Sequence, residues 1–205
     1  MTAAGRPGRL APWLPTGLAA LLAVLLFGSR TAPLAAPHVC VLAPRVEVGP
    51  GGQPQAVVPL ARPTLFARGA YASMRIEREG KPAWTLVSGD GGPIHGPVAW
   101  PLAPIRPGER LLLRLRPVGA SAEDFATIEL IGAAAARLTR TEEQIRRLGD
   151  DPELWHSAVQ TALAQGDLPL MLALLFAAEG PSAADLDALR MEVFHRGCGE
   201  GKPSP

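Results

Sequence analysis

The stretch Arg110-Leu-Leu-Leu-Arg-Leu-Arg116 decides the fold class of this 205-residue chain. Leucines at 111, 113 and 115 alternate along it with arginines at 110, 114 and 116. Successive side chains of a β-strand point to opposite faces, so one face of such a strand meets a core while the other meets water. The stretch therefore predicts a half-buried β-strand.

Similar short runs, broken by Gly and Pro, extend on both sides of this stretch. Breaks every eight to twelve residues are typical of an all-β sandwich or barrel. The predicted strands are Val41–Val48, Ala56–Leu60, Thr64–Arg68, Tyr71–Arg78, Ala83–Val87, Val98–Leu102, Arg110–Arg116 and Phe125–Ile131. Proline removes a ladder donor, so the prolines at 59, 63, 82, 97, 101 and 117 are expected at strand ends or edges. Together these runs predict an immunoglobulin- or fibronectin-like sandwich over residues 37–132.

The apolar period changes after residue 132, where about four short helices are predicted in residues 133–197. Asp151 and Asp167 stand at N-cap positions, and Ser182-Ala-Ala-Asp185 resembles a capping box. The glycines at 149, 166, 180 and 197 mark the helix ends. Connectors this short predict antiparallel helical hairpins. The whole chain is thus expected to be an α+β protein, with residues 198–205 as a tail.

The segment Leu10–Gly28 contains no charged residue and follows Arg6 and Arg9. A basic start before an apolar core is typical of a secretion signal, so residues 1–36 predict export to the periplasm or cell envelope. Cleavage after Ala36 would leave Leu34 at −3, where a small residue is preferred. The alternative is a retained inner-membrane anchor with its N-terminus inside, and this segment is where membrane contact is expected.

The formal charge is divided unevenly along the chain. Residues 1–119 carry 13 basic and 5 acidic side chains, whereas residues 120–205 carry 7 basic and 14 acidic ones. Such asymmetry can mark a surface for an anionic partner such as phospholipid headgroups. The favoured interpretation is that the two halves dock and neutralise each other. Basic residues are not interleaved with aromatic ones as a single-strand binder requires, so no nucleic-acid partner is expected.

Cys40 and Cys198 are the two cysteines of the chain. An even count in an oxidising compartment predicts a disulfide between them. Free thiols are one alternative, and another is a zinc site that adds His38 and His195 to the two cysteines. Zinc is disfavoured because such ligand pairs arise readily by chance and a disulfide would consume both thiolates. The disulfide and the zinc site both require the two ends of the mature chain to meet.

The run from Leu168 to Phe176 is apolar on nearly all sides. A helix of this kind is either buried centrally or presents a surface to a partner. The predicted partner-binding residues are Leu168, Leu170, Met171, Leu174, Leu175 and Phe176. No nucleophile elbow, phosphate-binding loop or calcium loop occurs, so no catalytic residue and no cofactor are predicted.

The layout resembles that of uncharacterised exported proteins of bacteria, especially cyanobacteria. The residues that carry the resemblance are Cys40, Arg62-Pro-Thr-Leu-Phe66, and Gly166 after Trp155. The resemblance implies a β-domain followed by short helices, and it implies no known activity.

The helical part also resembles tetratricopeptide hairpins. Gly149 and Gly180 are 31 residues apart, and Trp155, Ala158, Ala162 and Leu163 share one face of the second predicted helix. The repeat is shorter than the tetratricopeptide period of about 34, and the Trp-x-x-Leu-Gly pattern is not reproduced. A plain helical appendage packed on the sandwich is the alternative.

These patterns lead to one main functional prediction. The chain is expected to be a non-catalytic exported envelope protein that acts as a protein–protein interaction module, with a protein partner in the cell envelope. One alternative is a membrane-anchored periplasmic sensor or regulator subunit, and another is an enzyme of unknown type.

Overall fold

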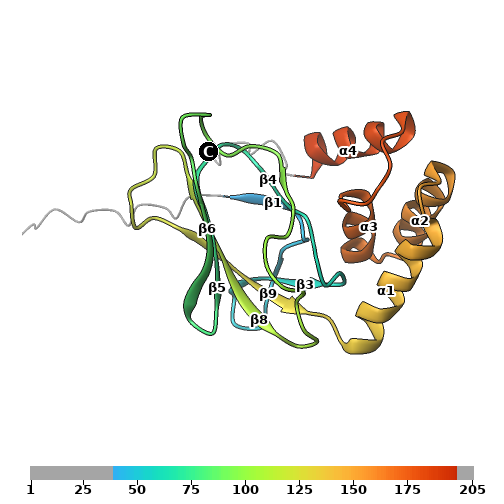
Figure 1. Cartoon of the computed structure of the whole chain (residues 1–205), viewed down its shortest axis with the longest axis horizontal. Helices are drawn as coiled ribbons and strands as arrows, with labels where there is room; N and C mark the ends of the chain where they lie inside the picture. The colour runs from blue at the N-terminus through green and yellow to red at the C-terminus, as the bar shows by residue number, and fades with distance from the viewer. Residues whose placement is uncertain (1–38, 198–205) are drawn as a thin grey trace, which may run out of the picture. The chain divides into compact units, whose positions relative to one another are not determined.

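A computed structural model describes residues 39–197 of the chain (Figure 1). Within these residues nine strands come first and four helices follow, so the protein is α+β with its two kinds of structure segregated along the sequence. The sequence predicted this order.

The strands form two sheets. The six-stranded sheet has the order β2 (Glu47–Val48), β3 (Pro54–Val58), β9 (Ala126–Gly132), β8 (Arg110–Pro117), β5 (Tyr71–Arg78) and β6 (Lys81–Val87). The three-stranded sheet has the order β1 (Cys40–Ala43), β4 (Leu65–Arg68) and β7 (Pro97–Val98). Neighbouring strands are antiparallel except β3 and β9, which run parallel.

The predicted alternation in β8 is confirmed. Leu111, Leu113 and Leu115 are at most 1% exposed, and they pack with side chains of β5 and β9. Leu65 and Ala67 of β4 belong to the same cluster, so the two sheets share one hydrophobic core. The arginines of β8 therefore lie on the opposite face of the six-stranded sheet.

Three of the prolines lie where the loss of a backbone donor is tolerated. Pro82 is in β6 and Pro97 is in β7, and each of these strands is at the edge of its sheet. Pro117 is the last residue of β8. These positions agree with the prediction that prolines mark strand ends and edges.

The helices are α1 (Ala135–Leu148), α2 (Pro152–Ala164), α3 (Leu168–Leu175) and α4 (Ala184–Arg196). The predicted caps of α2 and α3 are confirmed. The Asp151 carboxylate accepts hydrogen bonds from the N–H groups of Glu153 and Leu154, and that of Asp167 accepts one from Leu170. These bonds satisfy donors that an isolated helix start leaves unpaired.

The predicted capping box of α4 is wrong. The N-cap residue is Ala183, which has no side-chain capping bond. The Ser182 hydroxyl donates instead to Oδ2 of Asp187 at 3.0 Å. α4 begins at Ala184, so its N-cap position falls one residue after Ser182.

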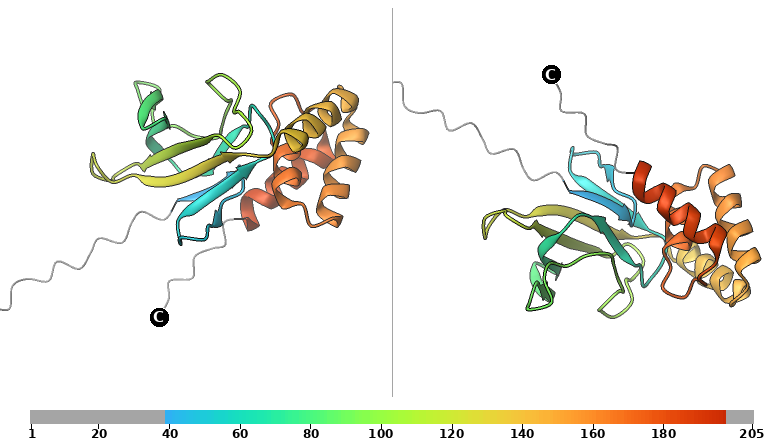
Figure 2. Two further views of the ribbon diagram at one scale, coloured as in Figure 1. Left: turned by 90° about the horizontal axis from the view of Figure 1, so that it is seen from below. Right: turned by 90° about the horizontal axis from the view of Figure 1, so that it is seen from above.

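A second cluster of buried side chains lies among the helices. Trp155, Leu174, Leu175 and Leu186 are each at most 1% exposed. The Trp155 indole N–H donates to the Gly149 carbonyl oxygen at 2.7 Å, so the buried ring has its polar atom satisfied. Figure 2 shows the helices together at one end of the strand part, which they contact through β1 and β3.

Two polar and aromatic contacts hold the helices in place. Arg137 of α1 donates two hydrogen bonds, at 2.6 and 2.8 Å, to the carboxylate of Asp167 at the start of α3. Phe66 of β4 packs against the helical cluster.

None of α1 to α4 is long and apolar enough to cross a bilayer.

Candidate functional site

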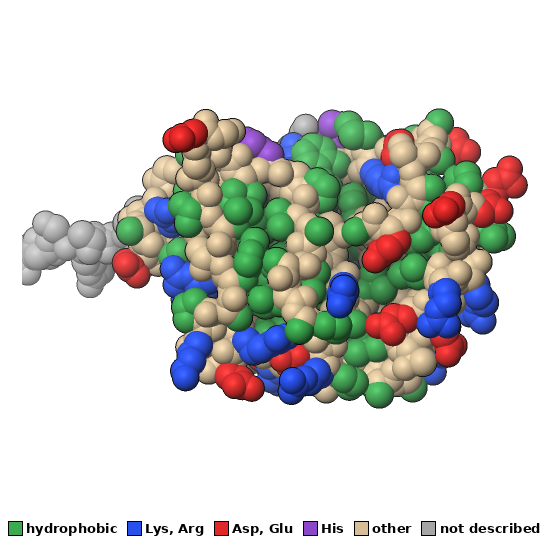
Figure 3. Space-filling view, in the orientation of Figure 1, with side chains coloured by type: hydrophobic (Ala, Val, Ile, Leu, Met, Phe, Trp, Pro, Cys, Tyr) green, Lys and Arg blue, Asp and Glu red, His purple; other side chains and the backbone are tan. Residues whose placement is uncertain are grey.

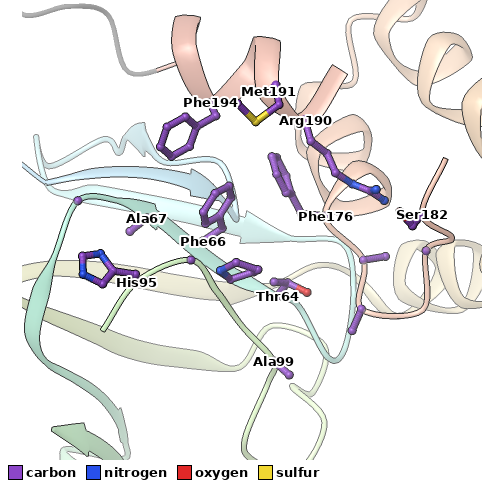
Figure 4. Close-up of a pocket in the computed structure, with 16 residues that line it drawn as sticks. Thr64, Phe66, Ala67, His95, Ala99, Phe176, Ser182, Arg190, Met191 and Phe194 are labelled. Carbon is purple, nitrogen blue, oxygen red and sulfur yellow. The ribbon is translucent and has the colours of Figure 1, made fainter. Parts of the chain in front are cut away.

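A groove of about 660 Å³ lies between the three-stranded sheet and the helices (Figure 4). Three separated parts of the chain line it: β4 and the residues just before it, the segment around β7, and the chain from the end of α3 through α4. The lining residues used below are Thr64, Phe66, His95, Phe176, Arg190, Met191 and Phe194. Cavities of this size accommodate small ligands or a partner's side chains.

Aromatic rings form the centre of the groove wall. The Phe66 ring lies 4.9 Å from that of Phe176 and 5.9 Å from that of Phe194, the latter pair being stacked at 18°. Arg68 places its guanidinium 5.4 Å from the Phe194 ring, an arrangement that favours a cation–π contact. Met191, one turn before Phe194, is 54% exposed. The wall is thus apolar and open to an incoming group.

Arg190 fixes the helical side of the groove. Its Nε donates to the Leu175 carbonyl oxygen at 2.8 Å, and its Nη2 donates to the Pro181 carbonyl oxygen at 3.2 Å. Its Nη1 donates to Oδ1 of Asp187 at 2.6 Å. This hydrogen bond, with a second one from Ser182, lowers the pKa of the Asp187 carboxyl. The Arg190 guanidinium is therefore already paired within the protein.

Few polar groups remain for a ligand. The Thr64 hydroxyl is buried and has no hydrogen-bond partner in the described part of the chain, and the exposed His95 lies across the groove from α4. Among residues 39–197 no cluster of His, Cys, Asp or Glu could hold a metal ion. The groove wall therefore offers mainly apolar contacts to a ligand.

The predicted partner-binding run Leu168–Phe176 was expected either to be buried centrally or to face a partner, and most of it is buried. Leu174 and Leu175 are at most 1% exposed, and Met171 is 9% exposed, so these side chains serve the helical core. Leu168 and Leu170 are half-buried against the same cluster. Phe176 is the member of the predicted set that lines the groove.

The other groove residues were missed by the sequence prediction. Met191 and Phe194 are three residues apart in α4, a spacing that places them on one helix face and could have drawn attention to it. Phe66 lies in a stretch singled out for another reason. Nothing local in the sequence indicates that these side chains meet.

The two ends of the described chain adjoin each other. A Cβ atom placed on Gly197 would lie 2.8 Å from Cδ2 of Leu42, two residues after Cys40. His195 is in the last turn of α4. His38 and Cys198 lie outside the described residues, so the disulfide and the zinc set both stay predictions.

Ion pairs between the two charge halves are few in the described part of the chain. One of them, Arg110 with Glu129 at 2.7 Å, joins residues 1–119 to residues 120–205. The other ion pairs of residues 39–197 each lie within one half, as in Arg114–Glu77 and Arg137–Asp167. The contact between the strands and the helices is apolar, through residues such as Phe66. Ion pairs among the described residues therefore make only a small part of the expected mutual neutralisation.

Comparison with known proteins gives little resemblance. No protein-family model matches the chain, and no curated protein matches it. Among solved structures, a chain described as "Structures of Clostridium thermocellum CbhA fibronectin(III)-like modules" aligns with a TM-score of 0.29 at 9% identity. The alignment covers 48% of this chain and 99% of that one.

Proposed function

We propose that this chain is a non-catalytic, exported protein of the cell envelope that acts as a protein–protein interaction module. The groove lined by Phe66, Phe176, Met191 and Phe194 is the proposed contact site for an apolar segment of the partner. The observation that carries this proposal is the open aromatic wall, in which Met191 is 54% exposed beside three phenylalanine rings.

The composition of the groove supports a binding role. Protein interfaces are enriched in aromatic residues and Met at their centres, where a few buried anchors supply most of the affinity. The rings of Phe66 and Phe194 are half-buried, so a partner would complete their burial. Because Arg190 is already paired with Asp187, the partner needs no opposite charge at this wall.

The strand edge beside the groove favours side-chain insertion over strand addition. β7 is at the edge of the three-stranded sheet, next to β4, and it begins with Pro97. Proline offers no N–H to an added strand, and edge prolines discourage such pairing. The partner is therefore expected to insert apolar side chains into the groove.

The scaffold in this proposal is an immunoglobulin- or fibronectin-like sandwich that carries antiparallel helical hairpins. The two sheets with a shared core support the sandwich. Contacts of α2 with α3, and of α4 with both, support the hairpins. The groove needs both parts, since its walls come from β4 and from α4.

Cross-linking from the groove tests the interaction. A photoreactive amino acid at position 191 should cross-link one discrete envelope protein in cells that produce the chain. Met191→Asp should abolish co-purification of that protein, because binding of the partner would bury the new carboxylate among the rings. Leu154→Asp, at a residue of α2 that is 47% exposed and does not line the groove, is the matched control. Equal behaviour of the two variants would refute the proposal.

Sequencing the N-terminus of the mature protein tests export. A start near residues 33–37 supports a cleaved signal peptide. A start at Met1 favours the membrane-anchored sensor or regulator subunit instead.

A further inference from the structure

The outer face of strands β5 and β8 carries a second feature, a cluster of three arginines. Arg75 of β5 is paired in register with Arg114 of β8, and Arg116 is paired with Ser73. The intervening side chains, such as Met74 and Leu115, lie in the core. The three arginines therefore share the face that points away from the core.

One carboxylate serves this cluster. Oε1 of Glu77 lies 2.8 Å from Nε of Arg114 and 3.8 Å from Nη1 of Arg75. The Glu77 side chain is only 10% exposed, whereas those of Arg75 and Arg114 are 33% and 35% exposed. Like charges placed directly opposite each other across two strands repel. Glu77 offsets one positive charge and leaves a local surplus of two.

Arg116 has no counter-charge in the described part of the chain. It forms no ion pair and no side-chain hydrogen bond with any residue of the described chain. The Nε–H groups of Arg75 and Arg116 are buried without a hydrogen-bond acceptor in residues 39–197. Buried donors in native proteins are rarely left unpaired, and a charged donor without an acceptor is the more costly case.

The cluster is held in shape and is open to solution. The Arg75 guanidinium lies 5.0 Å from the ring of Phe125, which restrains it by a cation–π contact. Figure 1 shows the helices at the far end of the strands, away from β5, β6 and β8. On the face seen in Figure 3, basic side chains gather over this strand part with a few acidic ones among them.

We propose that Arg75, Arg114 and Arg116 form a binding site for a phosphate group. The local surplus of two positive charges matches a phosphate dianion, whereas a carboxylate would offset only one of them. Guanidinium groups present forked donors that fit phosphate oxygens, and the terminal Nη groups of these three partly exposed side chains supply such donors. The site is independent of the aromatic groove, with which it shares no residue.

Two sources could present this phosphate, and two arms of one experiment separate them. In the first arm, sodium phosphate is titrated into the full-length protein at constant ionic strength while the NMR signals of the arginine Nε–H groups are followed. In the second arm, binding to vesicles of phosphatidic acid in phosphatidylcholine is compared with binding to phosphatidylcholine alone, because the headgroup of phosphatidic acid is a phosphate monoester that can carry two negative charges. Saturable shifts of the Arg75 and Arg116 signals in the first arm indicate a free phosphate or a phosphorylated solute. If binding that depends on Arg116 occurs in the second arm alone, the phosphate belongs to a lipid headgroup.

The variants Arg116→Gln and Arg110→Gln distinguish a site from general charge attraction. Both remove one positive charge from β8, but Arg110 lies outside the cluster and is paired with Glu129 at 2.7 Å. Arg116→Gln should weaken binding about tenfold or more, the loss expected for one charge-assisted hydrogen bond. Arg110→Gln should change it by less than about twofold, as expected for an exposed pair.

Two outcomes overturn the proposal. One is that neither arm shows binding that depends on Arg116. The other is that the two variants weaken binding equally, which would indicate attraction to the overall charge. Arg75→Gln serves as a second variant, and thermal melts establish that each variant is folded before binding is measured.

Discussion

The ring of Phe66 in β4 lies 4.9 Å from the ring of Phe176 at the end of α3. Phe66 belongs to the strand half by its place in the sequence, yet it packs against the hydrophobic cluster of the helical half. Since no ion pair in residues 39–197 joins the two halves, apolar contacts of this kind hold the helices against the sheets.

Phe66→Ala should therefore destabilise the whole folded unit. Removing a large, half-buried ring is expected to lower the free energy of unfolding by about 2–4 kcal/mol, measured by urea denaturation. Val87→Ala is the matched control, because Val87 is 58% exposed in the edge strand β6. This control should change the free energy of unfolding by less than about 0.5 kcal/mol. Similar losses in both variants would mean that Phe66 does not join the halves.

Arg190→Gln tests the attachment of α4. The substitution leaves the carbonyl oxygens of Leu175 and Pro181 without the donors that they have now. A loss of about 1–3 kcal/mol in the free energy of unfolding is expected. Arg196→Gln changes the same charge in the same helix, but Arg196 is 81% exposed and should matter little. A neutral Arg190→Gln would contradict the role given to this side chain.

The sequence predicted local structure well because its signals are local. The predicted strand Tyr71–Arg78 coincides with β5, and Arg110–Arg116 differs from β8 by one residue. Alternation and turn residues act within a few positions, so they locate strands without knowledge of their partners. The caps at Asp151 and Asp167 succeeded for the same reason.

The misses concern contacts between distant parts of the chain. Val41–Val48 was predicted as one strand, but it forms β1 and β2, which belong to different sheets. The parallel pairing of β3 with β9 joins residues such as Ala56 and Leu130, and no short pattern encodes it. The groove was missed in the same way, because Phe66, Phe176 and Phe194 come from three separate segments.

Gly132→Ala tests a close approach that the sequence could not reveal. A Cβ atom at Gly132 would overlap the carbonyl oxygen of Arg106 and lie 2.9 Å from a side-chain carbon of Ile105. The last residue of β9 must therefore be glycine. A loss of about 1–3 kcal/mol is expected from overpacking, measured by thermal or urea unfolding. At Gly91 no atom lies within 4 Å of the added Cβ position, so Gly91→Ala should hardly change the stability. Equal losses of stability in the two variants would argue against the close approach at Gly132.

The disulfide between Cys40 and Cys198 remains a prediction, supported by the approach of Gly197 to Leu42. The unfolded protein should not react with a thiol-alkylating reagent before reduction. After reduction, its mass should increase by two alkyl groups. Cys40→Ser, Cys198→Ser and the double variant should be equally destabilised, by up to about 5 kcal/mol, since each removes the same bond. Two alkylated thiols without reduction would exclude the bond, and metal analysis of protein kept reduced would then test the zinc set.

Tyr71 gives the fold a pH dependence at the alkaline end. Its hydroxyl donates to the Arg68 carbonyl oxygen at 2.8 Å, and burial raises the pKa of the phenol to about 12. Because folding favours the neutral phenol, this contribution to stability is complete below the unfolded pKa of about 10 and is lost as the pH rises through 12. Tyr71 is the single tyrosine of the chain, so tyrosinate absorbance reports this group alone. The midpoint of the tyrosinate absorbance should fall near pH 10 in urea and well above pH 10 in the folded protein. Between pH 10 and pH 12 the Tyr71→Phe variant should lose less stability than the parent protein. A folded-state midpoint near 10 would mean that the phenol is not buried.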